Sequence, residues 1–116
     1  MTNDYYLYCV ILENCPYSDA ANELLNSYKN IKKEVTIIKR SEKDKYKTDV
    51  INTFPQIYLK RYNTPGTKLI GGYTDIKYII NTFRNNTDKT YMTNYLNNNN
   101  SWNKKTLLRL IQLINT

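Results

Sequence analysis

The hydrophobic and polar positions of residues 5–39 change from one period to another along the chain. Residues 5–12 are rich in aromatic and β-branched side chains, and the run has the length of a buried strand. Residues 16–29 then place apolar side chains at helical spacing, and residues 35–39 return to a strand pattern. Two strands with a helix between them predict a parallel, right-handed βαβ unit.

The next part of the chain predicts a weak helix, a hairpin and a further helix. The charged stretch 41–52 predicts an amphipathic helix, with Ser41 as the N-cap and Asp44 three residues later. Two strands, 56–62 and 68–70, flank a Pro-Gly turn and predict a hairpin. The further helix is marked by apolar residues at helical spacing: Ile76, Ile79, Ile80 and Phe83. This order of elements predicts an α/β domain whose four-stranded sheet has a parallel half and an antiparallel half.

The C-terminal part of the chain is predicted to add a connection and one more helix to a domain formed by residues 1–85. Residues 86–100 are polar and rich in asparagine, which predicts a loop or linker with a short helical turn around Met92. Residues 101–116 carry a wide apolar stripe at helical spacing, and we expect this helix to pack on the same domain. A face this wide also suits a dimer or partner interface.

The net charge of +7 raises the question of nucleic-acid or membrane partners. The lysines are spread along the chain, and dispersed charge is typical of a solvated surface. Tyrosines of the kind that stack on bases fall in strand segments, where we expect structural roles: Tyr5, Tyr6, Tyr8 and Tyr58. We therefore expect no nucleic-acid partner.

The N-terminus carries no basic and apolar leader, and the chain has no apolar run near the ~20 residues needed to cross a bilayer. We therefore expect a one-domain cytoplasmic protein without a membrane partner. The two cysteines, Cys9 and Cys15, do not make a disulfide framework. The absence of histidine excludes Cys-His catalysis and the common zinc sites, and we expect no metal site.

Cys15 lies where the first strand ends and the first helix begins. Pro16 suits the first helical position because its φ is already helical and its missing N–H needs no partner there. Cys15 is therefore predicted to be the N-cap, where free N–H groups and the helix dipole favour the thiolate, which is the nucleophilic form. The alternative is an inert capping residue. Cys9, inside the strand, is expected to be buried as a small hydrophobe.

Three separated motifs occur in the order in which glutaredoxins carry them, and together they resemble that family. They are Cys-Pro-Tyr-Ser at 15–18, Thr-Phe-Pro-Gln at 53–56 and Gly-Gly-Tyr-Thr-Asp at 71–75. The resemblance covers residues 5–85. It implies a thioredoxin fold, with a central four-stranded mixed sheet flanked by helices, to which residues 101–116 add an extra C-terminal helix.

By this resemblance Cys15 is the catalytic nucleophile, and Tyr17 beside it lines a groove for glutathione. Phe54 and Pro55, preceded by Thr53, match the motif that places a cis proline opposite the thiol. The backbone of Phe54 would then pair with the glutathione tripeptide as a strand does. An ordinary proline at the start of a strand is the alternative interpretation of Pro55.

The glycine motif is expected to turn the chain tightly into the next helix. Gly72 and the N-terminus of that helix would take the γ-glutamyl carboxylate of glutathione. By resemblance Thr74 and Asp75 contact the same end of the ligand, and Asp75 suits its ammonium group. Both residues also suit helix capping, and the two roles are compatible.

Three positions depart from the family's usual pattern. Ser18 stands where dithiol members carry the resolving cysteine, which predicts a monothiol mechanism that a second glutathione completes. Leu12 stands where members commonly carry a lysine. The thiolate and glutathione would therefore be held less strongly unless a lysine from the charged helix substitutes. Phe54 replaces the usual valine, and its bulk is expected to reshape the groove and the substrate range.

These features predict a glutathione-dependent oxidoreductase that reduces glutathionylated proteins, with glutathione as the reductant and a monomeric state. One alternative is a glutathione-ligated [2Fe–2S] cluster carrier, although that subgroup typically has Cys-Gly-Phe-Ser. The other alternative is a catalytically weak thioredoxin-fold binding module, with Leu12 and Ser18 as its marks.

Overall fold

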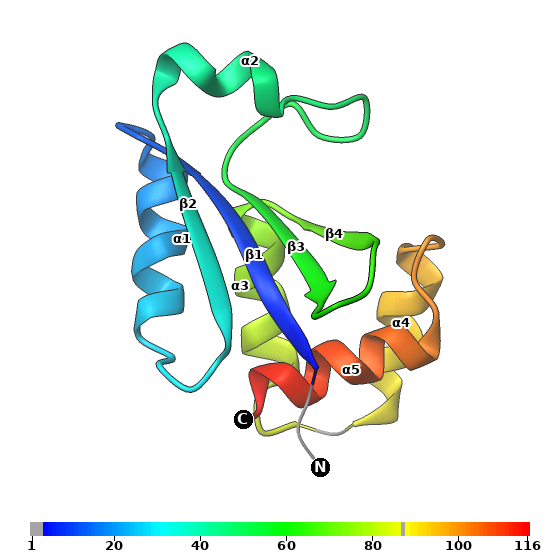
Figure 1. Cartoon of the computed structure of the whole chain (residues 1–116). Coiled ribbons are helices and arrows are strands. Elements are labelled where there is room, and N and C mark those ends of the chain that lie inside the picture. The colour runs from blue at the N-terminus through cyan, green and yellow to red at the C-terminus, as the bar shows by residue number, and fades with distance from the viewer. Residues whose placement is uncertain (1–3, 87) are drawn as a thin grey trace.

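A four-stranded mixed sheet forms the centre of the computed structural model, which describes residues 4–86 and 88–116 (Figure 1). The strands are β1 (Tyr5–Leu12), β2 (Lys33–Ile38), β3 (Gln56–Arg61) and β4 (Thr67–Gly71). Their order in the sheet is β2-β1-β3-β4. The β1 and β2 strands are parallel, whereas β3 is antiparallel to both β1 and β4. The α/β class and the two halves of the sheet agree with the prediction from sequence.

Within the described part of the chain, five α-helices surround the sheet: α1 (Pro16–Asn26), α2 (Lys43–Tyr46), α3 (Tyr73–Phe83), α4 (Lys89–Asn98) and α5 (Lys104–Ile114). The α1 and α3 helices cover one face, α2 lies beyond one end of the sheet, and α4 and α5 pack at the other end (Figure 1). None of the helices in these residues is both long enough and apolar enough to span a membrane.

The central strand β1 is buried on both sides of the sheet. Leu7, Cys9 and Ile11 alternate toward the larger core, which fills the space between the sheet and the helices α1, α3, α4 and α5. Val10 and Leu12 point to the opposite face, where a smaller cluster forms around them. This double burial explains why residues 5–12 read as an almost continuous apolar run.

The predicted helix over 41–52 is largely wrong. A 3-10 turn, η1 (Arg40–Glu42), leads into α2, which ends at Tyr46, and Ser41 caps neither element. The Thr48 hydroxyl instead accepts hydrogen bonds from the N–H groups of Val50 (3.2 Å) and Ile51 (3.0 Å). Such a side-chain turn competes with helical hydrogen bonds, and the charged stretch has no fully buried face to outweigh it.

Residues 86–100 contain the regular helix α4 where the sequence predicts a loop or linker. Asp88 caps the helix by accepting a hydrogen bond from the N–H of Thr90 at 2.8 Å. Tyr95 is buried edge-on between the rings of Phe83 (centroid distance 6.0 Å) and Trp102 (5.8 Å). A cap and two buried side chains, Met92 and Tyr95, therefore outweigh the asparagine-rich composition.

The apolar stripe of α5 is buried within the chain itself. Its buried residues belong to the larger core: Leu107, Leu110, Ile111, Leu113 and Ile114. Asn103 rather than a residue near 101 starts the helix, because its side chain accepts the N–H of Thr106 at 2.8 Å. The wide face of this helix is therefore occupied by the chain's own core.

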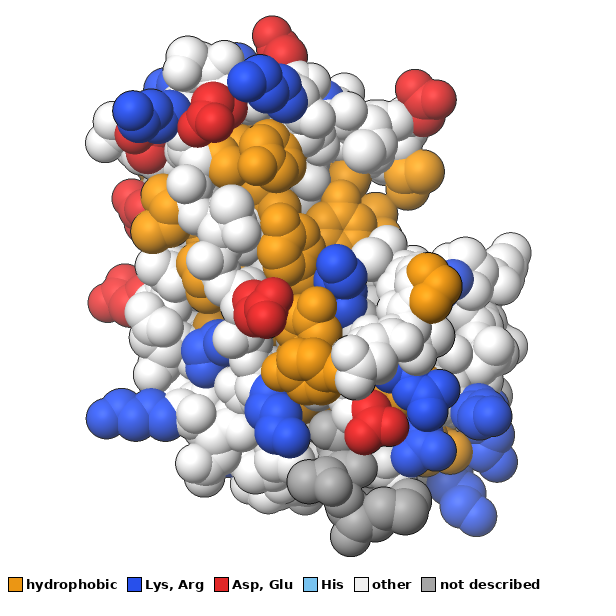
Figure 2. Space-filling view, in the orientation of Figure 1, with side chains coloured by type: hydrophobic (Ala, Val, Ile, Leu, Met, Phe, Trp, Pro, Cys, Tyr) orange, Lys and Arg blue, Asp and Glu red, His pale blue; other side chains and the backbone are white. Residues whose placement is uncertain are grey.

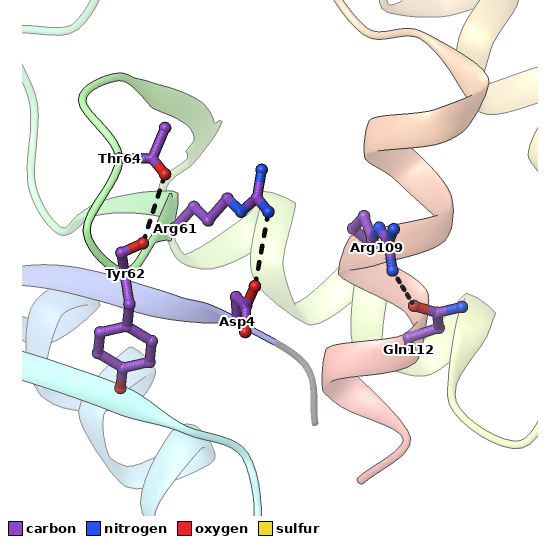
Figure 3. A network of polar contacts seen from close by, with 6 residues as sticks. All are labelled: Asp4, Arg61, Tyr62, Thr64, Arg109 and Gln112. Atoms are coloured by element: carbon purple, nitrogen blue, oxygen red, sulfur yellow. Dashed lines mark hydrogen bonds and ion pairs between the residues drawn. The ribbon is translucent and has the colours of Figure 1, made fainter. Parts of the chain in front are cut away.

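Polar contacts tie the β3–β4 hairpin to the start of β1, at the end of the sheet opposite Cys15 (Figure 3). Arg61 pairs with Asp4 at 3.5 Å, and the N–H of Tyr62 donates to the Asp4 carbonyl at 2.9 Å. The Thr64 hydroxyl donates to the Tyr62 carbonyl at 3.4 Å. In the same view, Arg109 donates to Gln112 at 3.5 Å along the surface of α5.

Two leucines of α5 provide a matched test of this packing. Leu110 is fully buried, so Leu110→Ala is expected to lower the free energy of unfolding by about 2–5 kcal/mol. Leu108 is 38% exposed, and Leu108→Ala is expected to cost less than about 1 kcal/mol. Urea denaturation of both variants measures the difference. Equal, small losses would show that α5 does not contribute to the core.

Candidate active site

Cys15 lies at the junction between β1 and α1, as the sequence predicts. It is the N-cap residue of α1, with Pro16 in the first turn, and its carbonyl accepts the N–H of Asp19 at 2.9 Å. Its thiol makes no capping hydrogen bond to the helix. The half-buried sulfur instead lies 3.9 Å from the Phe54 carbonyl, to which the thiol can donate. The thiol therefore faces the second sequence motif.

Phe54 presents its main chain to the thiol. The Phe54-Pro55 peptide bond is cis, as predicted. The carbonyl of Phe54 faces Cys15, while its N–H donates to no acceptor in the part of the chain that the structure describes. An N–H without an acceptor is a hydrogen-bond donor that an extended peptide can use in the manner of an added strand.

The glycine motif packs directly against the cis proline. A Cβ atom on Gly72 would lie 3.5 Å from the Pro55 carbonyl oxygen, which is ordinary contact distance. Gly71 has φ +135°, and a Cβ atom there would lie 2.2 Å from an Asp75 oxygen, so only glycine fits. The second and third motifs, distant in sequence, therefore meet at this edge of the sheet.

Asp75 starts α3 by accepting the N–H of Gly72 at 2.9 Å, which is the capping role considered from sequence. The same carboxylate also acts on the neighbouring helix α4. Burial first, and then the charges of Asp75 and Tyr78, raise the pKa of Tyr95 to about 12. Thr74 makes no capping bond to the helix among the described residues, and its side chain is exposed.

A surface groove of about 470 Å³ lies between the motifs. Residues predicted to bind a ligand line it: Tyr17, Thr53, Phe54, Gly72, Thr74 and Asp75. Pro55 is buried and Cys15 lies at the Phe54 side, so neither is a lining residue. The groove also includes Val50, Ile51 and Leu69, which were not predicted from the sequence as ligand contacts. The adjacent apolar residues Val50 and Ile51, in an otherwise polar stretch before Thr53, were the sequence feature that could have indicated this part of the groove.

Leu12 occupies the position at which glutaredoxins, the family that the motifs resemble, commonly carry a lysine. Its side chain is buried in the smaller core. The cation that the structure ties to the cysteine loop is Arg40, whose guanidinium donates to the Asn14 carbonyl at 2.5 Å. The backbone N–H of Arg40 also donates to the Glu13 carboxylate at 3.3 Å. An arginine of η1, and not a lysine of a long helix, therefore holds this loop.

Cys9 is fully buried in the larger core, as predicted. Burial raises the pKa of its thiol to about 12, and Lys33 opposes the shift only in part. Both cysteines are free thiols. No cluster of three or more histidine, cysteine or acidic side chains suited to a metal ion occurs among the residues that the structure describes. Cys15 is therefore the thiol that can react from the surface.

Comparison of the chain with protein-family models and with curated proteins finds no match. The site places one accessible thiol, an unpaired backbone N–H and the capped start of α3 around one groove.

Ser18 is fully buried, and its hydroxyl accepts the N–H of Leu12 at 3.1 Å. Ser18→Ala leaves that buried N–H without its partner and is expected to lower the free energy of unfolding by about 1–3 kcal/mol. Ser27 is the matched control, because its exposed hydroxyl bonds the Leu24 carbonyl in the same helix. Ser27→Ala is expected to cost less, as measured by urea denaturation. If Ser18→Ala leaves the free energy of unfolding unchanged, the buried hydrogen bond does not contribute to stability.

The two thiols are expected to differ in reaction with iodoacetamide at neutral pH. Native protein should gain one adduct, on Cys15, because Cys9 is buried and remains a neutral thiol well above pH 7. Protein unfolded in guanidinium should gain two adducts. Intact-mass and peptide mass spectrometry count and locate them. Rapid native modification of Cys9 would contradict its burial.

Proposed function

We propose that this protein is a glutathione-dependent thiol-disulfide oxidoreductase of glutaredoxin type that acts through Cys15 by a monothiol mechanism. The observation that carries the proposal is the thiol of Cys15 facing Phe54 at the edge of a groove lined by all three motifs. A thioredoxin fold is part of the proposal. The sheet order β2-β1-β3-β4, with α1 and α3 on one face, supports it.

Glutathione suits the groove in size and chemistry. A volume of about 470 Å³ lies within the range of small-molecule sites. The N–H of Phe54 would pair with the peptide backbone of glutathione, and the start of α3 at Gly72 would receive the γ-glutamyl carboxylate. The Asp75 carboxylate would face the ammonium group of the same residue. Tyr17, which is 64% exposed, would cover the ligand from the α1 side.

The reaction proceeds by two thiol-disulfide exchanges. The Cys15 thiolate attacks the glutathione sulfur of a glutathionylated substrate, so a Cys15–glutathione disulfide forms and the substrate–glutathione disulfide breaks. The substrate leaves as a thiolate and takes up a proton. The thiolate of a second glutathione, which has lost its proton, then attacks the glutathione sulfur bound to Cys15. Glutathione disulfide forms, and Cys15 leaves as a thiolate.

Ser18 makes the second glutathione necessary in this scheme. Its buried hydroxyl has no redox chemistry, and the other cysteine of the chain, Cys9, lies in the core. No second thiol of the chain can therefore reach the Cys15 disulfide and resolve it internally. For the same reason, a [2Fe–2S] cluster, which needs four ligands, would take only Cys15 from this chain and the rest from other molecules.

The test is turnover of a small glutathionylated thiol in the presence of glutathione, NADPH and glutathione reductase. Cys15→Ser is expected to abolish turnover, because the nucleophile is gone. Cys9→Ser is the matched control and is expected to keep most of the activity, provided that thermal denaturation shows it folded. If the wild type binds glutathione but shows no turnover, the protein is a binding module and not an enzyme.

A further inference from the structure

No long helix of the described residues covers the face of the sheet opposite α1 and α3 (Figure 1), and we call this the open face. Tyr8 and Val10 of β1, Tyr58 of β3 and Leu69 of β4 line a pocket of about 540 Å³ on this face. Figure 2 shows hydrophobic side chains in a band over the same face. The short α2 explains the exposure, because it ends before it can cross the sheet.

The open-face pocket adjoins the groove beside Cys15. Val50, Ile51 and Leu69 line both. Val50 is 80% exposed, and the turn centred on the Thr48 hydroxyl holds it in that position. A chain that leaves the groove can therefore continue onto the open face over apolar side chains.

The charge of the open-face pocket has one sign. Among the described residues that line it, Lys45 and Lys60 are charged and no acidic residue is present. The Lys60 ammonium lies 4.9 Å from the centre of the Tyr8 ring. Glu34 lies opposite Tyr8 on β2 but outside the pocket. Two lysines at the margin of an aromatic and aliphatic surface are complementary to a segment that combines acidic and apolar side chains.

We infer that the open face docks the protein part of the substrate and selects glutathionylated cysteines that lie in acidic, apolar segments. The inference rests on the proposed function, because it assigns the substrate's two parts to two adjoining surfaces. Glutathione occupies the groove, and the segment bearing the modified cysteine occupies the open face. The bonds that form and break are those of the first exchange above, with the substrate sulfur as the leaving group.

Three glutathionylated substrates separate the two surfaces: mercaptoethanol, a short acidic peptide with leucines around its cysteine, and the same peptide with lysines in place of glutamates. For the wild type, kcat/KM for the acidic peptide is expected to exceed that for the basic peptide by about tenfold. The double variant K45E/K60E is expected to lose that preference and to change the mercaptoethanol rate by less than about twofold. The matched control K104E/K105E makes the same charge change on α5 and is expected to keep the preference.

The outcomes distinguish the inference from the proposed function. Equal rates for both peptides, or a preference that K104E/K105E removes equally, would overturn the docking surface while leaving the enzyme in place. If mercaptoethanol is not turned over, fluorescence anisotropy of the unmodified acidic peptide still tests the surface. Binding that K45E/K60E weakens supports the surface. If a single-stranded oligonucleotide binds more tightly and displaces the acidic peptide, the surface belongs to nucleic acid and the inference is overturned.

Discussion

One buried hydrogen bond, from the N–H of Leu12 to the hydroxyl of Ser18, joins the last residue of β1 to the first turn of α1. The position of Cys15 depends on this bond, because the residues between the two partners form the loop that carries the thiol. Arg40 holds the same loop from outside through the Asn14 carbonyl. Asn14 has φ 55°, a left-handed conformation that asparagine tolerates better than most residues. The thiol is therefore placed by contacts that do not involve the sulfur itself.

The elements with strong periodicity could be predicted from the sequence, and those decided by single side chains could not. β1 is buried on both faces, so its apolar run is unambiguous, and Pro16 fixes the start of α1. The stretch after β2 depends on whether Thr48 bonds to its own loop, and composition does not reveal that choice. Likewise, α4 is stabilised by the Asp88 cap and by the packing of Tyr95 against Phe83 and Trp102, which composition does not reveal.

The candidate site was also predictable only in part. Its three motifs were visible in the sequence because each combines residues with special backbone or chemical properties, namely cysteine, proline and paired glycines. Their convergence needed the sheet order, which brings the Gly72 backbone against Pro55. The roles of Arg40 and Val50 at the site could not be predicted, for a physical reason. A cation in a charged stretch and an exposed valine in a loop become informative only when their neighbours across the chain are known.

Asp75 links the fold of this edge to its chemistry. Its carboxylate begins α3 and lies against Gly71, whose φ of +135° favours glycine, and its charge acts on Tyr95 of α4. A ligand ammonium that paired with this carboxylate would share it with the Gly72 N–H. Occupancy of the groove and order at the start of α3 would then be thermodynamically linked, each favouring the other. A change at Asp75 would then alter the start of α3 and the binding of the proposed ligand together.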